Sequence, residues 1–223
     1  MIIYHTHEKL SDPLIKELYD NFATSEYFCN NIYTTFPKVL SKHFPDKIEN
    51  FYRKNLSKIL TKLGLSGRIV INDAKWCQIY TGSYGGNHPS HQHYSGTELF
   101  SWVHFVDVPT DQKCFYFEDS LGNKQYPDTQ NSGDLIVFPS WAVHGCDSLR
   151  KSKAHRAIVA GNITCLKYKD CIDPQFPLSD DNPAVFHITN EINDEEIKTI
   201  WTIHNPGVVE RKKLLTTSFN ETS

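Results

Sequence analysis

The sequence predicts a mainly β protein with helical support, in which a β-sandwich or small barrel follows an N-terminal helical layer. Apolar residues recur at helical spacing in the first part of the chain. After Gly67 the pattern changes to short β-branched and aromatic runs separated by turn residues. With 223 residues, the chain can bury one sizeable core and carry some decoration. We therefore expect one structural domain.

The N-terminal helical layer is expected over residues 1–66. The stretch SDPLIKELYDNF, residues 11–22, opens with a capping Ser or Asp and a proline in the first turn, and its apolar residues recur at helical spacing. The stretches at 36–44 and 46–65 continue in the same style, and the second ends near Gly64, as helices often do. This layer carries no cluster of reactive residues in the sequence, so we expect it to support the fold.

The β core is expected over residues 67–168. The predicted strands are RIVIND, KWCQIY, LFSWVHFVDV, CFYFED, DLIVFP and RAIVAGNITCL. Their large aromatic residues are expected in the core, and Glu118 and Asp119 are expected to mark a turn. From residue 169 to residue 223 the regularity fades, and we expect an extension with one helix at about residues 194–204.

The bulk composition bears on several classes of protein. The formal net charge of -3 gives no global reason to expect binding to nucleic acid or to an anionic membrane. No window approaches the roughly 20 apolar residues of a membrane span, and the N-terminus lacks the pattern of a signal peptide. The six cysteines are scattered without a C-x-x-C pair, which favours reduced thiols. We expect a cytoplasmic protein.

Two histidines stand close together in SHQHYSG, residues 90–96. Residues i and i+2 of an extended segment project to the same side, so His91 and His93 can converge on one metal ion. Imidazole suits zinc, copper, nickel and iron, and His144, which follows a predicted buried strand, is the candidate third ligand. His88 offers an alternative register for the first ligand. His104 is expected either in the core or in the wall of a substrate pocket.

An arginine opens the apolar run RAIVAGNITC. A buried guanidinium is costly without an anion, because its fixed donors need a carboxylate or phosphate, so we expect Arg156 to hold an anionic co-substrate. Tyr80, at the end of KWCQIY, can add a hydroxyl donor to the same anion. Asn162 either orients a ligand or satisfies buried backbone groups.

The ordered set KWCQIY, H-Q-H, LFSWVHFVDVP, SGDLIVFPSWAVHGC and R-A-I-V-A-G-N resembles the double-stranded β-helix oxygenases that use Fe(II) and 2-oxoglutarate. Within them it is similar to the 2-oxoglutarate oxygenases of phages and bacteria, and more distantly to the prolyl 4-hydroxylases. The resemblance covers residues 76–162, and its most specific part is GDLIVFPSWAVHG with Arg156 and Asn162 behind it. It implies a jelly-roll, cupin-like core with the N-terminal helices packed on it.

The resemblance also implies roles for single residues. His91 and His144 match the metal-binding histidines, and Arg156 matches the residue that binds the far carboxylate of 2-oxoglutarate, with Tyr80 assisting it. Asn162 is a further candidate for the cofactor-binding set.

The departure from the superfamily is at His93, where an Asp or Glu is usual. Either His93 itself, a carboxylate such as Glu98 or Asp119, or water is then the third ligand. A neutral imidazole in place of a carboxylate makes the metal complex one unit more positive, which strengthens its hold on an anionic co-substrate.

The resemblance implies Fe(II) as the metal, 2-oxoglutarate and O₂ as co-substrates, and ascorbate as a candidate reductant. The implied reaction is the hydroxylation of a C–H bond, with release of succinate and CO₂. Prolyl residues are the candidate substrate by analogy, and a peptide and a small molecule both remain open. Two alternative hypotheses are a three-histidine cupin-type dioxygenase that ignores 2-oxoglutarate and a non-catalytic β-barrel that binds a partner.

Overall fold

A computed structural model describes residues 1–22, 26–29, 32–35, 44–63, 69–80, 86–94, 98–109, 113–148, 155–167 and 185–188. The helices are α1 (Asp12–Phe22) and α2 (Asp46–Lys62). The strands are β1 (Tyr4–His7), β2 (Glu26–Cys29), β3 (Ile32–Thr34), β4 (Ile69–Tyr80), β5 (His88–His91), β6 (Glu98–Asp107), β7 (Phe115–Glu118), β8 (Lys124–Gln125), β9 (Asp134–Pro139), β10 (His144–Cys146), β11 (Arg156–Lys167) and β12 (Val185–Ile188).

The chain forms two compact units. The first comprises Met1–Ile48 and Lys75–Asn162, and the second comprises Glu49–Ala74 and Ile163–Ser223. In the second unit, β12 pairs antiparallel with the beginning of β4, and α2 buries an apolar stripe that includes Tyr52, Leu56 and Leu60. Neither α1 nor α2 has the length and hydropathy that a membrane-spanning helix requires.

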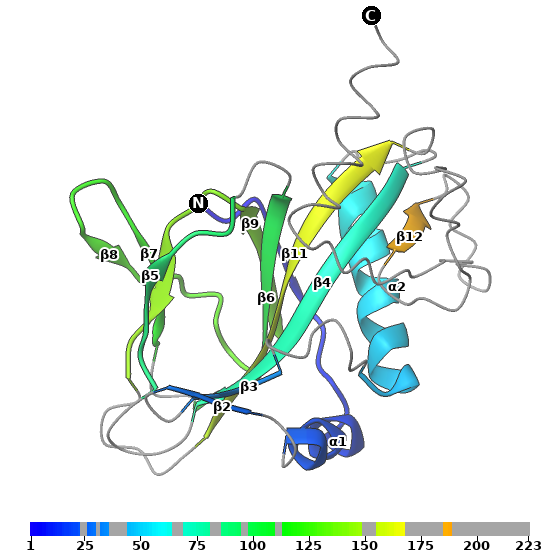
Figure 1. Ribbon diagram of the computed structural model, residues 1–223, viewed down its shortest axis with the longest axis horizontal. Helices are drawn as coiled ribbons and strands as arrows, with labels where there is room; N and C mark the ends of the chain where they lie inside the picture. Colours follow the sequence, from blue (N-terminus) through cyan, green and yellow to red (C-terminus); the bar gives the residue numbers. More distant parts are fainter. Residues whose placement is uncertain are drawn as a thin grey trace, which may run out of the picture. The chain divides into compact units, whose positions relative to one another are not determined.

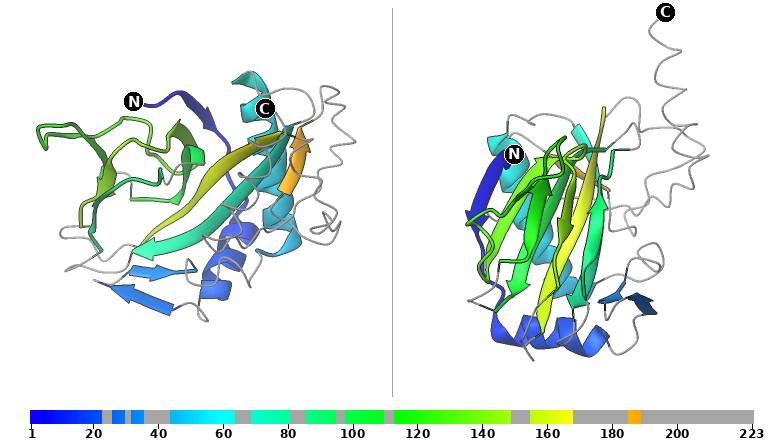
Figure 2. Two further views of the ribbon diagram at one scale, coloured as in Figure 1. Left: turned by 45° about the horizontal axis from the view of Figure 1, so that its top comes forward. Right: turned by 90° about the vertical axis from the view of Figure 1, so that its left-hand side faces the viewer.

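Two β-sheets build the first unit. The larger sheet has the strand order β1-β9-β6-β11-β4-β3-β2, and the smaller sheet has the order β5-β10-β7-β8. The smaller sheet stands opposite β6, β11 and β4 of the larger sheet (Figure 1), and the two further views show the same strands (Figure 2). Several neighbouring strands, such as β1 with β9 and β6 with β11, come from distant parts of the chain, as in a jelly roll.

The apolar core of the first unit lies where these two sheets meet. Phe117 of β7 and Phe138 of β9 pack edge to face, with ring centroids 5.1 Å apart. Phe115, also of β7, packs in the same way against Phe105 of β6 at 5.7 Å. Edge-to-face pairs add to the energy of apolar burial, so this aromatic cluster fixes one sheet against the other.

The β core predicted from the sequence is confirmed. RIVIND and KWCQIY form one strand, β4, and the other four predicted runs each form a strand within one or two residues of the expected bounds. Asp119 accepts hydrogen bonds from the backbone N–H of Leu121 and Asn123, so its predicted place in a turn is also confirmed. Cys77, Cys114 and Cys146 are free thiols, as expected.

The predicted helical layer is right for α1 and α2 but incomplete, because β1, β2 and β3 also lie in it. These short strands gain their stability from pairing with longer strands rather than from their own composition. The alternation is visible in β3, where Ile32 and Thr34 are buried and Tyr33 is exposed. The helix expected at 36–44 lies almost wholly outside the described residues. The helix expected at 194–204 lies outside the described residues, and the boundaries 1–66, 67–168 and 169–223 stay predictions.

Candidate metal centre and co-substrate pocket

The pairing of β5 with β10 brings two of the predicted ligands together. His91 and His144 are directly opposite each other in this antiparallel pair, and their ring centroids are 4.5 Å apart. Opposite residues of an antiparallel pair project to the same face of the sheet, so both imidazoles point into the space between the two sheets.

His93 reaches the same point from the segment that follows β5. Its backbone N–H donates to the carbonyl of Ser140, and the hydroxyl of Ser140 donates to the carbonyl of Glu98. The imidazole of His93 lies 4.9 Å from that of His91 and 5.0 Å from that of His144, measured between ring centroids. Each of the three residues offers a ligand atom, and these atoms lie within 4.8 Å of one another.

Backbone carbonyls set the protonation of two of these rings. Nδ1–H of His91 donates to the carbonyl of Pro89 at 2.8 Å, and Nδ1–H of His144 donates to the carbonyl of Ala142 at 2.8 Å. With the proton held on Nδ1, the lone pair of each ring is on Nε2, which is the usual arrangement of a metal-binding histidine.

Burial keeps the three imidazoles neutral. It lowers the pKa of His144 to about 3 and that of His93 to about 4, and it also lowers the pKa of His91. A metal ion binds the neutral ring, so no proton competes with it at neutral pH.

His88 lies beside His91 and lines the same cavity, but neither it nor the two carboxylates that were alternatives belong to the group of three ligand atoms. Nδ1 of His88 lies 3.1 Å from Nδ1 of His91, on the side of that ring opposite to Nε2. The carboxylate of Asp119 is bonded within its own turn. The group of possible ligands that the described residues form contains three imidazoles and no carboxylate, so Glu98 is not part of it either.

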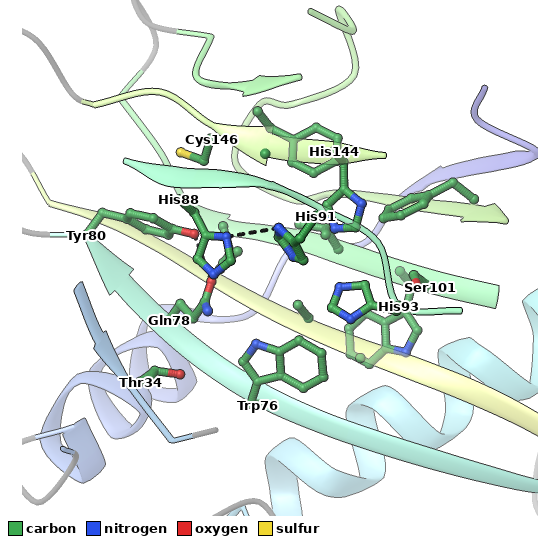
Figure 3. A pocket seen from close by; sticks show the side chains of 18 of the residues that line it. Thr34, Trp76, Gln78, Tyr80, His88, His91, His93, Ser101, His144 and Cys146 are labelled. Atoms are coloured by element: carbon green, nitrogen blue, oxygen red, sulfur yellow. Dashed lines mark hydrogen bonds between the residues drawn. The ribbon is translucent and has the colours of Figure 1, made fainter. Parts of the chain in front are cut away.

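The histidines open onto a cavity of about 320 Å³ between the two sheets. In Figure 3, His91, His93 and His144 lie on one side of it, and Trp76, Gln78 and Tyr80 point toward them from the opposite sheet. Its remaining lining is mostly apolar and includes Trp102, Val103, Phe115, Phe138, Ile158 and Ala160. His104 is fully buried but does not line this cavity, so it is a core residue.

Arg156 lines the same cavity and is only 2% exposed. Its guanidinium lies over the ring of Tyr80, 4.3 Å from the centroid, and its Nη1 donates to the thiol of Cys146. Nε and Nη2 are buried and have no hydrogen-bond partner among the described residues. A buried cation with two orphaned donors is the arrangement that the sequence predicted for an anion site.

Tyr80 and Asn162, the other two predicted cofactor-binding residues, differ in position. Tyr80 lines the cavity, and its hydroxyl donates to Oε1 of Gln78 at 2.8 Å. Burial raises the pKa of this hydroxyl, so it stays protonated. Asn162 is not among the lining residues; its Oδ1 accepts from the hydroxyl of Ser101, which does line the cavity.

Three solved structures are similar in fold to this chain. A prolyl hydroxylase from Trichoplax adhaerens, in complex with a peptide fragment of the oxygen degradation domain of hypoxia inducible factor, has 10% identity and a TM-score of 0.54 over 72% of this chain and 82% of its own. The non-heme alpha ketoglutarate dependent epimerase SnoN from nogalamycin biosynthesis has 12% identity and a TM-score of 0.53 over 72% and 77%. AviO1 from Streptomyces viridochromogenes has 12% identity and a TM-score of 0.53 over 72% and 88%.

The chain has the double-stranded β-helix fold of these proteins. The predicted fold is therefore confirmed. No family model and no curated protein sequence matches the chain.

Within this double-stranded β-helix, the sequence reasoning missed Gln78, Trp76 and Thr34 as pocket residues. Trp76 and Gln78 share a face of β4 with Tyr80, so the period of two along KWCQIY was a signal for both. Thr34 had no such signal. It lies opposite Gln78 in the pairing of β3 with β4, and β3 falls in the stretch expected to be helical.

Proposed function

We propose that this protein is a non-haem oxygenase that depends on Fe(II) and 2-oxoglutarate and hydroxylates a C–H bond of its substrate. The observation that carries the proposal is the conjunction, in one cavity, of three converging neutral imidazoles and a buried arginine with two orphaned donors. A metal site alone fits many reactions, whereas the arginine adds the need for an anion beside the metal.

The donor set fits a divalent first-row metal. His91, His93 and His144 are the residues that would hold it, and two of them already have Nε2 free and Nδ1 anchored. Imidazole suits iron among these metals, and three protein ligands leave coordination positions open for a co-substrate and for oxygen. When bound, Fe(II) supplies the redox chemistry by which oxygen is activated.

Arg156 binds and orients the co-substrate. The planar fork of a guanidinium matches a carboxylate in a bidentate manner, and its two orphaned donors supply that fork. 2-Oxoglutarate has a carboxylate at the end remote from its 2-oxo acid group, so it satisfies Arg156 while its other end faces the metal. The aromatic and aliphatic lining excludes water from the space between the two ends.

The presence of His93 in place of a carboxylate supports one alternative function, which the same experiment can test. Three imidazoles without a carboxylate are also the ligands of cupin-type dioxygenases that act without 2-oxoglutarate. Such an enzyme has no use for the anion site, so its turnover would survive the loss of Arg156.

The test is to load the anaerobic protein with Fe(II), add 2-oxoglutarate, and record a visible charge-transfer band and, after oxygen is admitted, succinate. Wild type should show both, His144→Ala should lose iron and succinate together, and Arg156→Ala should lose the band while retaining iron. His155→Ala, at an exposed position next to Arg156, is the matched control. Iron binding without any response to 2-oxoglutarate would shift the assignment to the three-histidine dioxygenase.

The substrate is the finer part of the proposal. The Trichoplax adhaerens prolyl hydroxylase was solved with a peptide, which makes prolyl residues in a peptide the first substrate to screen. Hydroxylation is read as a gain of one oxygen atom in the product mass, and ascorbate is added as the reductant.

A further inference from the structure

Gln78 is hydrogen-bonded to Tyr80 and lines the same cavity as Arg156, the two residues that were expected to hold the co-substrate. It is in β4 two positions before Tyr80, it is largely buried, and it lines the cavity into which Arg156 also faces. Figure 3 shows its amide directed toward the cavity between Tyr80 and Trp76. A buried amide in a mostly apolar wall is costly unless its donors and acceptor are used.

The contacts of Tyr80 decide which donor faces the cavity. Its hydroxyl carries one proton, and this proton is donated to Oε1 of Gln78 at 2.8 Å. A hydroxyl that uses its proton in this way has none left for a carboxylate. The same bond fixes the orientation of the Gln78 amide, because it holds Oε1 and leaves the two N–H groups of Nε2 as the available donors.

We propose that Nε2 of Gln78 donates to the distal carboxylate of 2-oxoglutarate beside Arg156, and that Tyr80 is a positioning residue that orients the Gln78 amide. This inference rests on the proposed function. It replaces the expectation that the Tyr80 hydroxyl itself binds the co-substrate.

The chemistry of a carboxylate fits this pair of donors. Its two oxygens offer about four lone-pair sites, and a guanidinium fork fills two of them. An amide N–H can fill a third without adding charge to a cavity that already holds one buried cation. Arg156 thus supplies the positive charge, and Gln78 adds selectivity for a carboxylate at the distal end of the co-substrate.

The test compares two ligands that differ only at the distal end. 2-Oxovalerate has the 2-oxo acid group and chain length of 2-oxoglutarate but a methyl group in place of the distal carboxylate. Zn(II) serves as a redox-inert metal, and affinities are measured by isothermal titration calorimetry. Gln78→Leu should weaken 2-oxoglutarate about 10- to 100-fold, as expected for one lost hydrogen bond to a charged group, and should change 2-oxovalerate less than about threefold.

A matched control and a positioning test complete the design. Gln125→Leu removes an exposed amide from β8 and should leave both affinities unchanged. Tyr80→Phe keeps the ring beneath Arg156 and removes the hydroxyl, so it should weaken 2-oxoglutarate about 3- to 10-fold in wild type. In the Gln78→Leu background no amide is left to orient and the hydroxyl proton is free, so the effect of the same substitution should differ from its effect in the wild type.

The outcomes separate this inference from the proposed function. If the wild type does not bind 2-oxoglutarate, both are overturned. If the wild type binds it and Gln78→Leu binds equally well, or loses both ligands to the same extent, only the role of Gln78 is overturned. Fully additive effects of Tyr80→Phe and Gln78→Leu would overturn the positioning role of Tyr80.

Discussion

Replacing Arg156 by methionine should stabilise the ligand-free protein while removing its response to 2-oxoglutarate. Two guanidinium nitrogens, Nε and Nη2, are buried without a partner among the described residues. An unsatisfied buried donor costs about 1–3 kcal/mol, and more when it belongs to a charged group. Against this stand the stacking of the guanidinium on Tyr80, worth about 2 kcal/mol when desolvated, and the hydrogen bond from Nη1 to the Cys146 thiol, worth about 1 kcal/mol. We expect a net gain of about 1–3 kcal/mol, since apolar replacements of buried charges are often stabilising.

The assay is urea unfolding of the Zn(II)-loaded protein with and without 2-oxoglutarate. At a ligand concentration 100 times its Kd, the wild type should gain about 2.7 kcal/mol in its free energy of unfolding, and Arg156→Met should gain nothing. Arg156→Lys is the control, because it keeps a charge in the cavity without the planar fork. A ligand-free Arg156→Met protein that is less stable than the wild type would refute the reasoning, since it would mean that the guanidinium is satisfied before any anion binds.

Three further predictions concern packing, acid and metal. Gly161→Ala should lower the free energy of unfolding by about 1–3 kcal/mol, because a Cβ there would lie 2.6 Å from the indole of Trp102; an unchanged urea midpoint would contradict this contact. In the metal-free protein, the unfolded histidines take up protons as the pH falls below about 6.5, whereas burial lowers the pKa of His144 to about 3 and of His93 to about 4 in the folded state. The unfolded state then binds more protons, so the free energy of unfolding should decrease as the pH is lowered from about 6.5 to about 4. A urea midpoint independent of pH over that range would disprove the argument. His144→Ala should weaken Zn(II) binding by more than the 10- to 100-fold that is typical when a residue hydrogen-bonded to a metal ligand is lost. The measurement is a chelator competition, with His155→Ala as the reference.

The sequence was informative wherever one strand carries its own signal. The convergence of His91, His93 and His144 could be predicted, because the spacing of two and the strand end before the third are local patterns. Arg156 could be predicted because a cation in an apolar run requires an explanation. In both cases the residue type and its immediate neighbours were sufficient, and the structure brings all four to one cavity.

What could not be predicted depends on pairing between strands. The place of His93 stayed open, because only the fold shows that its backbone N–H donates to the Ser140 carbonyl and that its ring reaches the other two imidazoles. The hydrogen bond from the Tyr80 hydroxyl to Oε1 of Gln78 could not be predicted either, and the role of Tyr80 toward a ligand stays a prediction. No pattern in the sequence shows whether the hydroxyl proton of Tyr80 goes to Gln78 or to a ligand.

The carbonyls that hold His91 and His144 each lie two residues earlier in the chain, at Pro89 and Ala142. Each bond therefore closes a small loop within one peptide segment and does not cross between strands. If β5 and β10 shifted relative to each other, the separation of the two rings would change, but the nitrogen that carries the proton would not. The tautomers are a property of two short peptides, whereas the ligand geometry is a property of the sheet. A substitution that shifts β5 against β10 would therefore change the separation of the two imidazoles without changing the nitrogen that carries the proton in either ring.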